Sequence, residues 1–123
     1  MLPSGHRMRR RHEFTLAVRR GNRAGRPHLV AHLYLPSADE TAEPEGNPLV
    51  GFIVSKAVGN AVVRNRVQRR LRHLLRDRVH RLPAGSLLVV RANPKAATAP
   101  TEELVKDVDS ALGRLLRQSA KGQ

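Results

Sequence analysis

Residues 55–82 read SKAVGNAVVRNRVQRRLRHLLRDRVHRL, and apolar side chains recur in them at every third or fourth position. This is the period of an α-helix with one buried side, so the pattern predicts a helix over residues 61–82. Just upstream, Gly59 and Asn60 suit a tight turn from a strand into the helix, with Asn60 as the N-cap. The buried side is predicted to consist of Val63, Val67, Leu71, Leu74, Leu75, Val79 and Leu82.

The opposite side of this helix is strongly basic. At about 100° per residue, one line is formed by Asn65, Arg69, Arg72 and Arg76, and Arg66, Arg70 and His73 lie beside it. Like charges four residues apart destabilise an isolated helix, and residues 55–81 hold eight Arg but one acid, Asp77. A solvated polar face is the ordinary reading of a charged helix, but this excess of arginine favours a bound polyanion.

The whole chain has the same bias. Its 123 residues carry 23 Lys and Arg against 10 Asp and Glu, a net charge of +13. Residues 1–36 contribute +7 and residues 55–81 contribute +8, and Arg presents a planar fork to phosphate oxygens. The absence of cysteine excludes thiolate catalysis, Cys-ligated zinc and iron–sulfur clusters, and fits a reducing compartment.

The length predicts a single domain over residues 1–123, and its charge predicts that this domain binds a polyanion. Residues 1–12 are expected to form a basic arm, and residues 36–48, PSADETAEPEGNP, an acidic loop. The N-terminus lacks the apolar stretch of a secretory signal, and no run approaches about 18 apolar residues. A cytoplasmic protein without membrane contact is therefore expected.

The remaining elements complete an α+β fold with helices against one sheet. Helices are predicted at 8–20 and 101–117, and strands at 28–35, 49–56 and 86–92, with a short extra strand near 22–26. Alternation in HLVAHLYL places one set of side chains on the buried face of its strand, namely Leu29, Ala31, Leu33 and Leu35.

The stretch SKAVGNAVVRNRVQRRLRHLLR at 55–76 resembles the signature of the protein subunit of bacterial ribonuclease P, a strand ending in a GNAV-RNR turn followed by a basic helix. Other family-like segments follow the family order along the chain: RRHEF at 10–14, RRGNR at 19–23, HLVAHLYL at 28–35, GFIVSK at 51–56 and ELVKDVDSALGRLL at 103–116. The resemblance covers nearly the whole sequence.

The resemblance implies an accessory subunit of an RNA-based endoribonuclease. In that family the protein joins a catalytic RNA, which uses Mg²⁺ to remove the 5′ leader from precursor tRNA, and it binds the leader and broadens substrate specificity. No obligate protein partner is implied. The implied fold is a small two-layer α/β sandwich, ribosomal-protein-S5-domain-2-like, with a mixed sheet of about four strands. Its βαβ crossover is left-handed, whereas such connections are ordinarily right-handed.

The resemblance also assigns roles by position. The RNA-binding set consists of Lys56, Arg64, Asn65, Arg66, Arg69, Arg70 and Arg72, to which the basic line adds Arg76. The leader-binding cleft would use Phe14, Val18, His32 and Tyr34. Relatives often carry a second Phe at the position of Val18, an aromatic at that of His32 and a Lys at that of Gln68. Stacking of a base on an aromatic side chain is worth about 1–3 kcal/mol. Because the predicted cleft has few aromatic side chains, leader binding here is expected to depend more on charge and shape.

Two other functions compete with this one. His73, Asp77 and His80 fall on one side of the predicted helix and could approach a metal ion, but no acidic cluster or glycine-rich phosphate loop accompanies them. No catalytic residue and no metal ligand are therefore predicted. An architectural or ribosomal-type RNA-binding protein without a nuclease role would share the charge, and only the GNAVVRNR pattern separates it from the family.

Overall fold

The computed structural model describes residues 4–37, 39–40 and 46–121 of the chain. Its helices and strands, with 3-10 turns labelled η, are η1 (Ser4–His6), α1 (Arg11–Arg20), β1 (Asn22–Gly25), β2 (Leu29–Tyr34), β3 (Leu49–Ile53), α2 (Ala61–Arg76), η2 (Val79–Arg81), β4 (Leu87–Ala92), η3 (Pro94–Ala97) and α3 (Thr101–Lys121). Every predicted element is present, including the short strand near 22–26, and most bounds differ from the prediction by a few residues.

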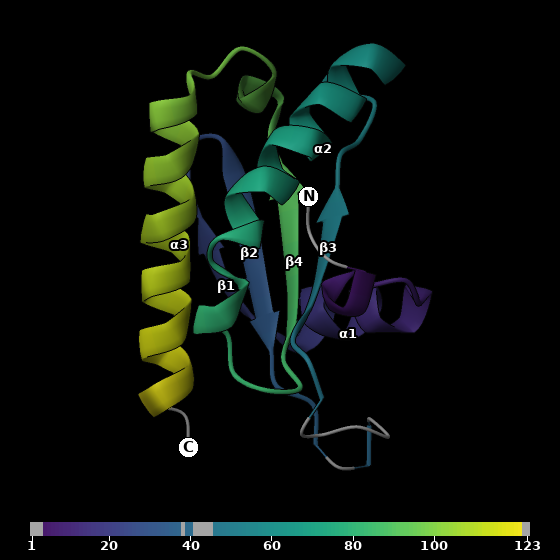
Figure 1. Ribbon diagram of the computed structural model, residues 1–123, viewed down its shortest axis with the longest axis vertical. Helices are drawn as coiled ribbons and strands as arrows, with labels where there is room; N and C mark the ends of the chain where they lie inside the picture. The colour runs from purple at the N-terminus through teal and green to yellow at the C-terminus, as the bar shows by residue number, and fades with distance from the viewer. Residues whose placement is uncertain (1–3, 38, 41–45, 122–123) are drawn as a thin grey trace.

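The four strands form one mixed sheet in the order β1-β2-β4-β3. β1 and β2, and β2 and β4, are antiparallel, whereas β3 and β4 are parallel and are joined through α2. In Figure 1 β3 points upward, β4 lies to its left, and α2 crosses in front of the sheet. A chain that moves left while its helix passes in front makes a left-handed crossover, so the handedness implied by the resemblance is confirmed.

The main core lies between the sheet and the pair α2 and α3, which cover one face (Figure 1). The alternation predicted for β2 is confirmed by Leu29, Ala31 and Leu33, which are all buried on that face. Leu35 lies beyond the end of β2 and is 41% exposed, so its predicted burial is wrong. α1 packs on the opposite face, over β2 and β4, where Ala17 and Val89 belong to a second, smaller core.

α2 ends at Arg76, earlier than the periodicity predicts. Past that residue, the Arg78 guanidinium makes two bonds to the Asp109 carboxylate of α3, at 2.6 and 3.2 Å, and a third to the carbonyl of Leu74 at 2.8 Å. The same guanidinium lowers the pKa of Asp109. The chain tightens into η2, which still buries Val79 and Leu82. The apolar pattern therefore predicted the burial of Val79 and Leu82 correctly, but it did not predict that α2 ends at Arg76.

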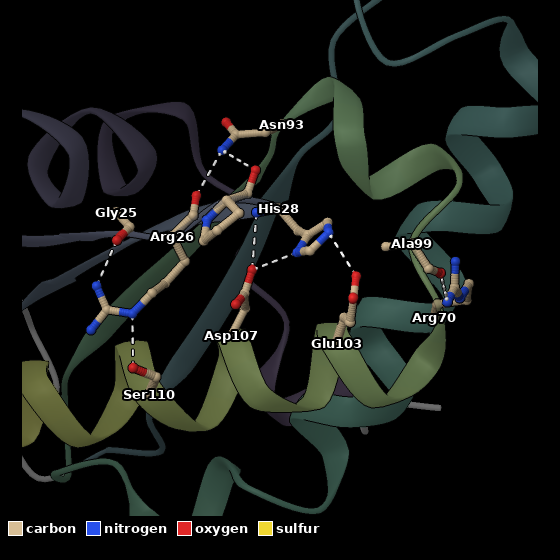
Figure 2. Close-up of polar contacts among 10 residues, drawn as sticks. Gly25, Arg26, His28, Arg70, Asn93, Ala99, Glu103, Asp107 and Ser110 are labelled. Atoms are coloured by element: carbon tan, nitrogen blue, oxygen red, sulfur yellow. Dashed lines mark hydrogen bonds and ion pairs between the residues drawn. The ribbon is translucent and has the colours of Figure 1, made fainter.

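α3 is fastened to the start of β2 by polar contacts (Figure 2). The Asp107 carboxylate accepts from the backbone N–H of His28 at 2.9 Å and contacts its Nδ1 at 2.7 Å, while Glu103 lies 3.3 Å from its Nε2. Beside them Arg26 donates to the Ser110 hydroxyl at 2.8 Å. These contacts fix α3 across β1 and β2 and leave α2 to cover the other half of the sheet.

The N-terminal segment lies along the outer edge of β3. Met8 donates its N–H to the Val50 carbonyl at 2.9 Å and is itself buried, and Arg7 forms an isolated parallel bridge with Val50. His6, Arg7 and Met8 of the predicted basic arm are therefore docked along β3, residues 11–12 begin α1, and residues 1–3 lie outside the described part. Of the predicted acidic loop, residues 38 and 41–45 also lie outside it.

Among the described residues, no helix combines the length and the apolar character that crossing a membrane would require.

Gly51 of β3 is expected to tolerate no side chain, because a Cβ there would overlap the ring of Phe14 and lie 3.1 Å from the Met8 sulfur. We predict that Gly51→Ala lowers the free energy of unfolding by about 1–3 kcal/mol through overpacking. Gly25→Ala is the matched control, because nothing lies within 4 Å of the added Cβ. Denaturant unfolding of both variants measures the difference, and equal stabilities would contradict the prediction.

Candidate nucleic-acid interface

The basic helix α2 starts at a tightly closed turn. The Asn60 side chain accepts a hydrogen bond from the Val63 N–H at 3.0 Å, which confirms the predicted N-cap. A Cβ at Gly59 would lie 2.8 Å from a methyl group of Val63, so only glycine fits the turn. Lys56, exposed in the same turn, accepts through its carbonyl from the Gly59 N–H at 3.2 Å. The turn thus sets the direction in which the helix leaves β3.

Burial of one side of α2 fixes where its cations point. Val67, Leu71 and Leu75 have no exposed surface, and they face the sheet and α3. The opposite side forms an outward row, defined as Asn65, Arg69 and Arg76, whose members are all exposed. Arg72, which the helical period placed in the same line, is half-buried toward the edge of β3. In the described part of the chain Arg69 has no hydrogen-bond or ionic partner, and Arg76 contacts the neighbouring Asp77 at 3.5 Å.

Two predicted RNA contacts on one flank of this row have partners within the protein. Arg70 donates to the Ala99 carbonyl at 2.6 Å (Figure 2), and Arg66 donates to the Ala97 carbonyl at 3.3 Å. They brace α2 against the η3–α3 connection. Because neutral carbonyls accept these bonds, both guanidinium groups keep their full charge. The helical period placed these residues beside the outward row, but it gave no sign of this bracing.

The other flank of α2 faces the edge of β3. It holds Arg64, Gln68 and Arg72, which succeed one another at four-residue intervals and are all half-buried. The Nε of Arg64 is buried with no hydrogen-bond partner, and Arg72 likewise has none, among the residues that the structure describes. The predicted RNA-binding set on α2 therefore divides into one flank whose arginines bond backbone carbonyls and two rows in which, among the described residues, Arg76 alone has an ionic partner, the neighbouring Asp77.

A groove of about 530 Å³ lies on the sheet face opposite α2, and it brings together two of the four predicted cleft residues. Val18 of α1 and His32 of β2 both line it. Its other lining residues are Gly21, Arg23, Val30, Ser55, Ala57, Arg91, Ala92, Asn93 and Pro94.

The remaining two cleft candidates lie outside this groove. Phe14 lies against Gly51 at the β3 side of α1. Tyr34 packs under α1, and its hydroxyl donates to the Glu40 carboxylate at 2.5 Å. Glu40 also pairs with Arg20 at 2.7 Å, which fixes the Tyr34 hydroxyl beneath α1.

Two arginines that the sequence analysis did not select lie on either side of His32. Arg23 is opposite His32 in the register of β1 and β2, and Arg91 is opposite Val30, two residues from His32 on the same face. Both side chains line the groove. The sequence does show each arginine within or beside a predicted strand, Arg23 in RRGNR and Arg91 in VVRAN. It does not show that the two lie close together, because that depends on the register of the folded sheet.

His32 itself is buried, with 7% of its surface exposed, and its Nδ1 has no hydrogen-bond partner among the described residues. Burial lowers the pKa of His32, and the positive charges of Arg23 and Arg91 lower it further. The imidazole is therefore neutral near pH 7, and the positive charge of the groove comes from the two arginines. Such a groove combines the apolar side chains of Val18 and Val30 with the positive charges of Arg23 and Arg91, which suits a single-stranded polyanion.

A metal site at His73, Asp77 and His80 is not supported by the geometry, because α2 ends before Asp77. Across the described ranges, no group of three His, Asp or Glu side chains is placed to hold a metal ion.

Comparison with known proteins gives one consistent result. A family model described as Ribonuclease P matches residues 2–116. The chain is 58% identical to the ribonuclease P protein component of Streptomyces avermitilis over 123 residues, covering 98% of this chain and 100% of that one. It is 57% identical to the one from Thermobifida fusca, covering 95% of this chain and 80% of that one.

Solved structures support the fold. The RNase P protein of Staphylococcus aureus superposes with a TM-score of 0.72 at 20% identity, covering 88% of this chain and 93% of that one. The RNase P protein of Thermotoga maritima gives a TM-score of 0.68 at 21% identity, covering 90% and 96%.

The depressed pKa of His32 predicts an acid-sensitive fold. As the pH falls below the ordinary value of about 6.5, the unfolded chain binds a proton at this position before the folded protein does, so the free energy of unfolding decreases. His32→Phe should flatten stability between pH 7.5 and pH 5, as measured by denaturant unfolding at both values. A variant whose stability falls as steeply as that of the unchanged protein would contradict this.

Proposed function

This chain belongs to the ribonuclease P protein family and is a protein component of bacterial ribonuclease P, and we propose that it binds the catalytic RNA through α2 and the 5′ leader of precursor tRNA through the groove. The role in tRNA 5′ processing comes with the family. The architectural alternative is not favoured, because the family model spans almost the entire chain. The RNA subunit carries out cleavage, and this chain is its accessory subunit.

The observation that best supports RNA binding by α2 is the set of unpaired cations on a rigid helix. Arg69 and Arg72 have no partner in the described part of the chain, and the sheet holds their helix in one orientation. Guanidinium groups without internal partners are suited to phosphate oxygens. The proposed contacts are Lys56, Arg64, Asn65, Arg66, Arg69, Arg70, Arg72 and Arg76, with Arg66 and Arg70 adding their charge while they brace the helix.

The groove on the open sheet face is the proposed leader site. Arg23 and Arg91 would bind leader phosphates, and Val18 and His32 would form the floor under the bases. Phe14 would extend this site toward β3, and Tyr34 would stabilise its α1 wall. Since one Tyr and two Phe are the only aromatic residues in the sequence, charge would contribute more to leader affinity than stacking does.

Mg²⁺ is proposed as the metal ion of the reaction, held by the catalytic RNA and its substrate, since phosphoryl transfer commonly uses divalent ions to stabilise the attacking and leaving oxygens. The cytoplasm is the proposed compartment, because precursor tRNA is processed there.

Reconstitution tests the assignment. The purified chain is added to the catalytic RNA of a bacterial ribonuclease P at low Mg²⁺, and removal of the 5′ leader from precursor tRNA is followed. We expect stimulation by the unchanged protein, and Arg69→Ala with Arg72→Ala should weaken assembly about 10- to 100-fold, at about 0.7–1.4 kcal/mol for each contact. The salt dependence of assembly should also become shallower. No stimulation by the unchanged protein would exclude the function, and unchanged assembly by the variant would exclude this helix surface.

The leader site has its own test. Arg23→Gln with Arg91→Gln should weaken holoenzyme binding of precursor tRNA about tenfold, while binding of the same tRNA without a leader stays the same. Substrate titration with the two tRNAs measures the difference. Equal losses for both tRNAs, or no loss for either, would show that the groove does not bind the leader.

A further inference from the structure

A second basic cavity, of about 220 Å³, lies at the edge of the sheet between α1 and α2. We call it the β3-edge cavity. Its lining residues come from the N-terminal segment, α1, β3 and α2, and they are Arg7, Met8, Arg9, Phe14, Val50, Gly51, Phe52, Gln68 and Arg72. The lining residues of the groove on the open sheet face are all different from these, and the proposed extension of the leader site, Phe14, is the one residue common to both sites.

The N-terminal wall of this cavity is held in place by the fold. Met8 is buried, and its N–H bonds the Val50 carbonyl at 2.9 Å. Upstream, His6 Nδ1 lies 3.0 Å from the Pro48 carbonyl. The backbone of Arg7 and Met8 is therefore held along β3, and Arg9 follows directly after the anchored Met8.

The charge around the cavity is of one sign. Three arginines line it and no carboxylate does. The single acid of α1, Glu13, is occupied at the helix start, where it accepts from the Arg10 N–H at 3.3 Å. Folding thus brings the basic N-terminal segment against the basic helix, and an anion between them would relieve the repulsion between Arg9 and Arg72. Glu13 lines a neighbouring pocket with Arg7 and Arg9, on the side of the segment that faces α1.

We propose that the β3-edge cavity binds a backbone phosphate of the catalytic RNA, held by Arg9 and Arg72, with the Gln68 amide as an additional donor. RNA that lies on the outward row of α2 would then continue over the edge of β3 to the N-terminal segment. The docked segment would act as part of the RNA interface as well as a cover for the sheet edge. This inference rests on the proposed function, because it takes the catalytic RNA as the ligand.

The test compares two charge-matched variants. Arg9→Gln removes one exposed cation at the cavity, and Arg114→Gln removes one exposed cation from α3, where no described residue pairs with it. Binding to the catalytic RNA is measured by filter retention over a range of salt concentrations. We expect about a tenfold loss for Arg9→Gln, with the slope of log K against log salt reduced by about one phosphate contact. Arg114→Gln should change both values little.

A double-mutant cycle adds Arg72→Gln. If both guanidinium groups hold one phosphate, the second substitution should weaken binding less than it does alone, so the two effects are not additive. Circular dichroism verifies that each variant is folded. Equal behaviour of Arg9→Gln and Arg114→Gln, or strict additivity with Arg72→Gln, would overturn the proposed site while leaving the function intact. Failure of the unchanged protein to bind the RNA would overturn both.

Discussion

The burial of α2 against the sheet is the constraint on which the rest of the molecule depends. Val67, Leu71, Leu74 and Leu75 face the core and are fully or nearly buried. Each fully buried Leu or Val side chain stabilises the fold by about 1.5–3 kcal/mol, so rotating the helix about its axis would cost several such contributions. Every polar residue of α2 therefore has a fixed direction, and an RNA-facing surface exists because the opposite surface is apolar.

The distribution of acids determines which cations stay unpaired. Asp109 pairs with Arg78 and Arg81 just past the end of α2, and Asp107 and Glu103 contact His28. All three acids belong to α3 and stabilise its packing. Along α2, by contrast, Arg66 and Arg70 bond neutral carbonyls. The fold gains braces from these arginines and loses none of their charge, which suits a surface whose partner is a polyanion.

On the other face of the sheet, charge is the main feature of the groove. Val18 and His32 line it, and so do the two cations Arg23 and Arg91. The two arginines and burial keep His32 uncharged near neutral pH, so the groove floor stays suited to bases. Binding that depends on charge should weaken with salt more steeply than binding that depends on stacking.

The sequence by itself determined what short-range periodicity can encode. The spacing of apolar residues identified α2 and its exposed Asn65, Arg69 and Arg76, and Asn60 identified the start of the helix, because a helix repeats within four residues and a cap acts within three. The left-handed crossover was implied by the resemblance that the GNAVVRNR turn carries, and no local periodicity encodes it.

Only the tertiary structure decided the contacts between distant segments. The pairing of Arg78 with Asp109 just past the end of α2 joins residues 31 positions apart, and the bond from Arg70 to Ala99 joins residues 29 positions apart. The groove needs the register that sets Arg23 and Arg91 around His32, and the β3-edge cavity needs the docking of Met8 on Val50. Such pairings arise from the shape of the packed sheet and helices, which no local pattern of residues specifies.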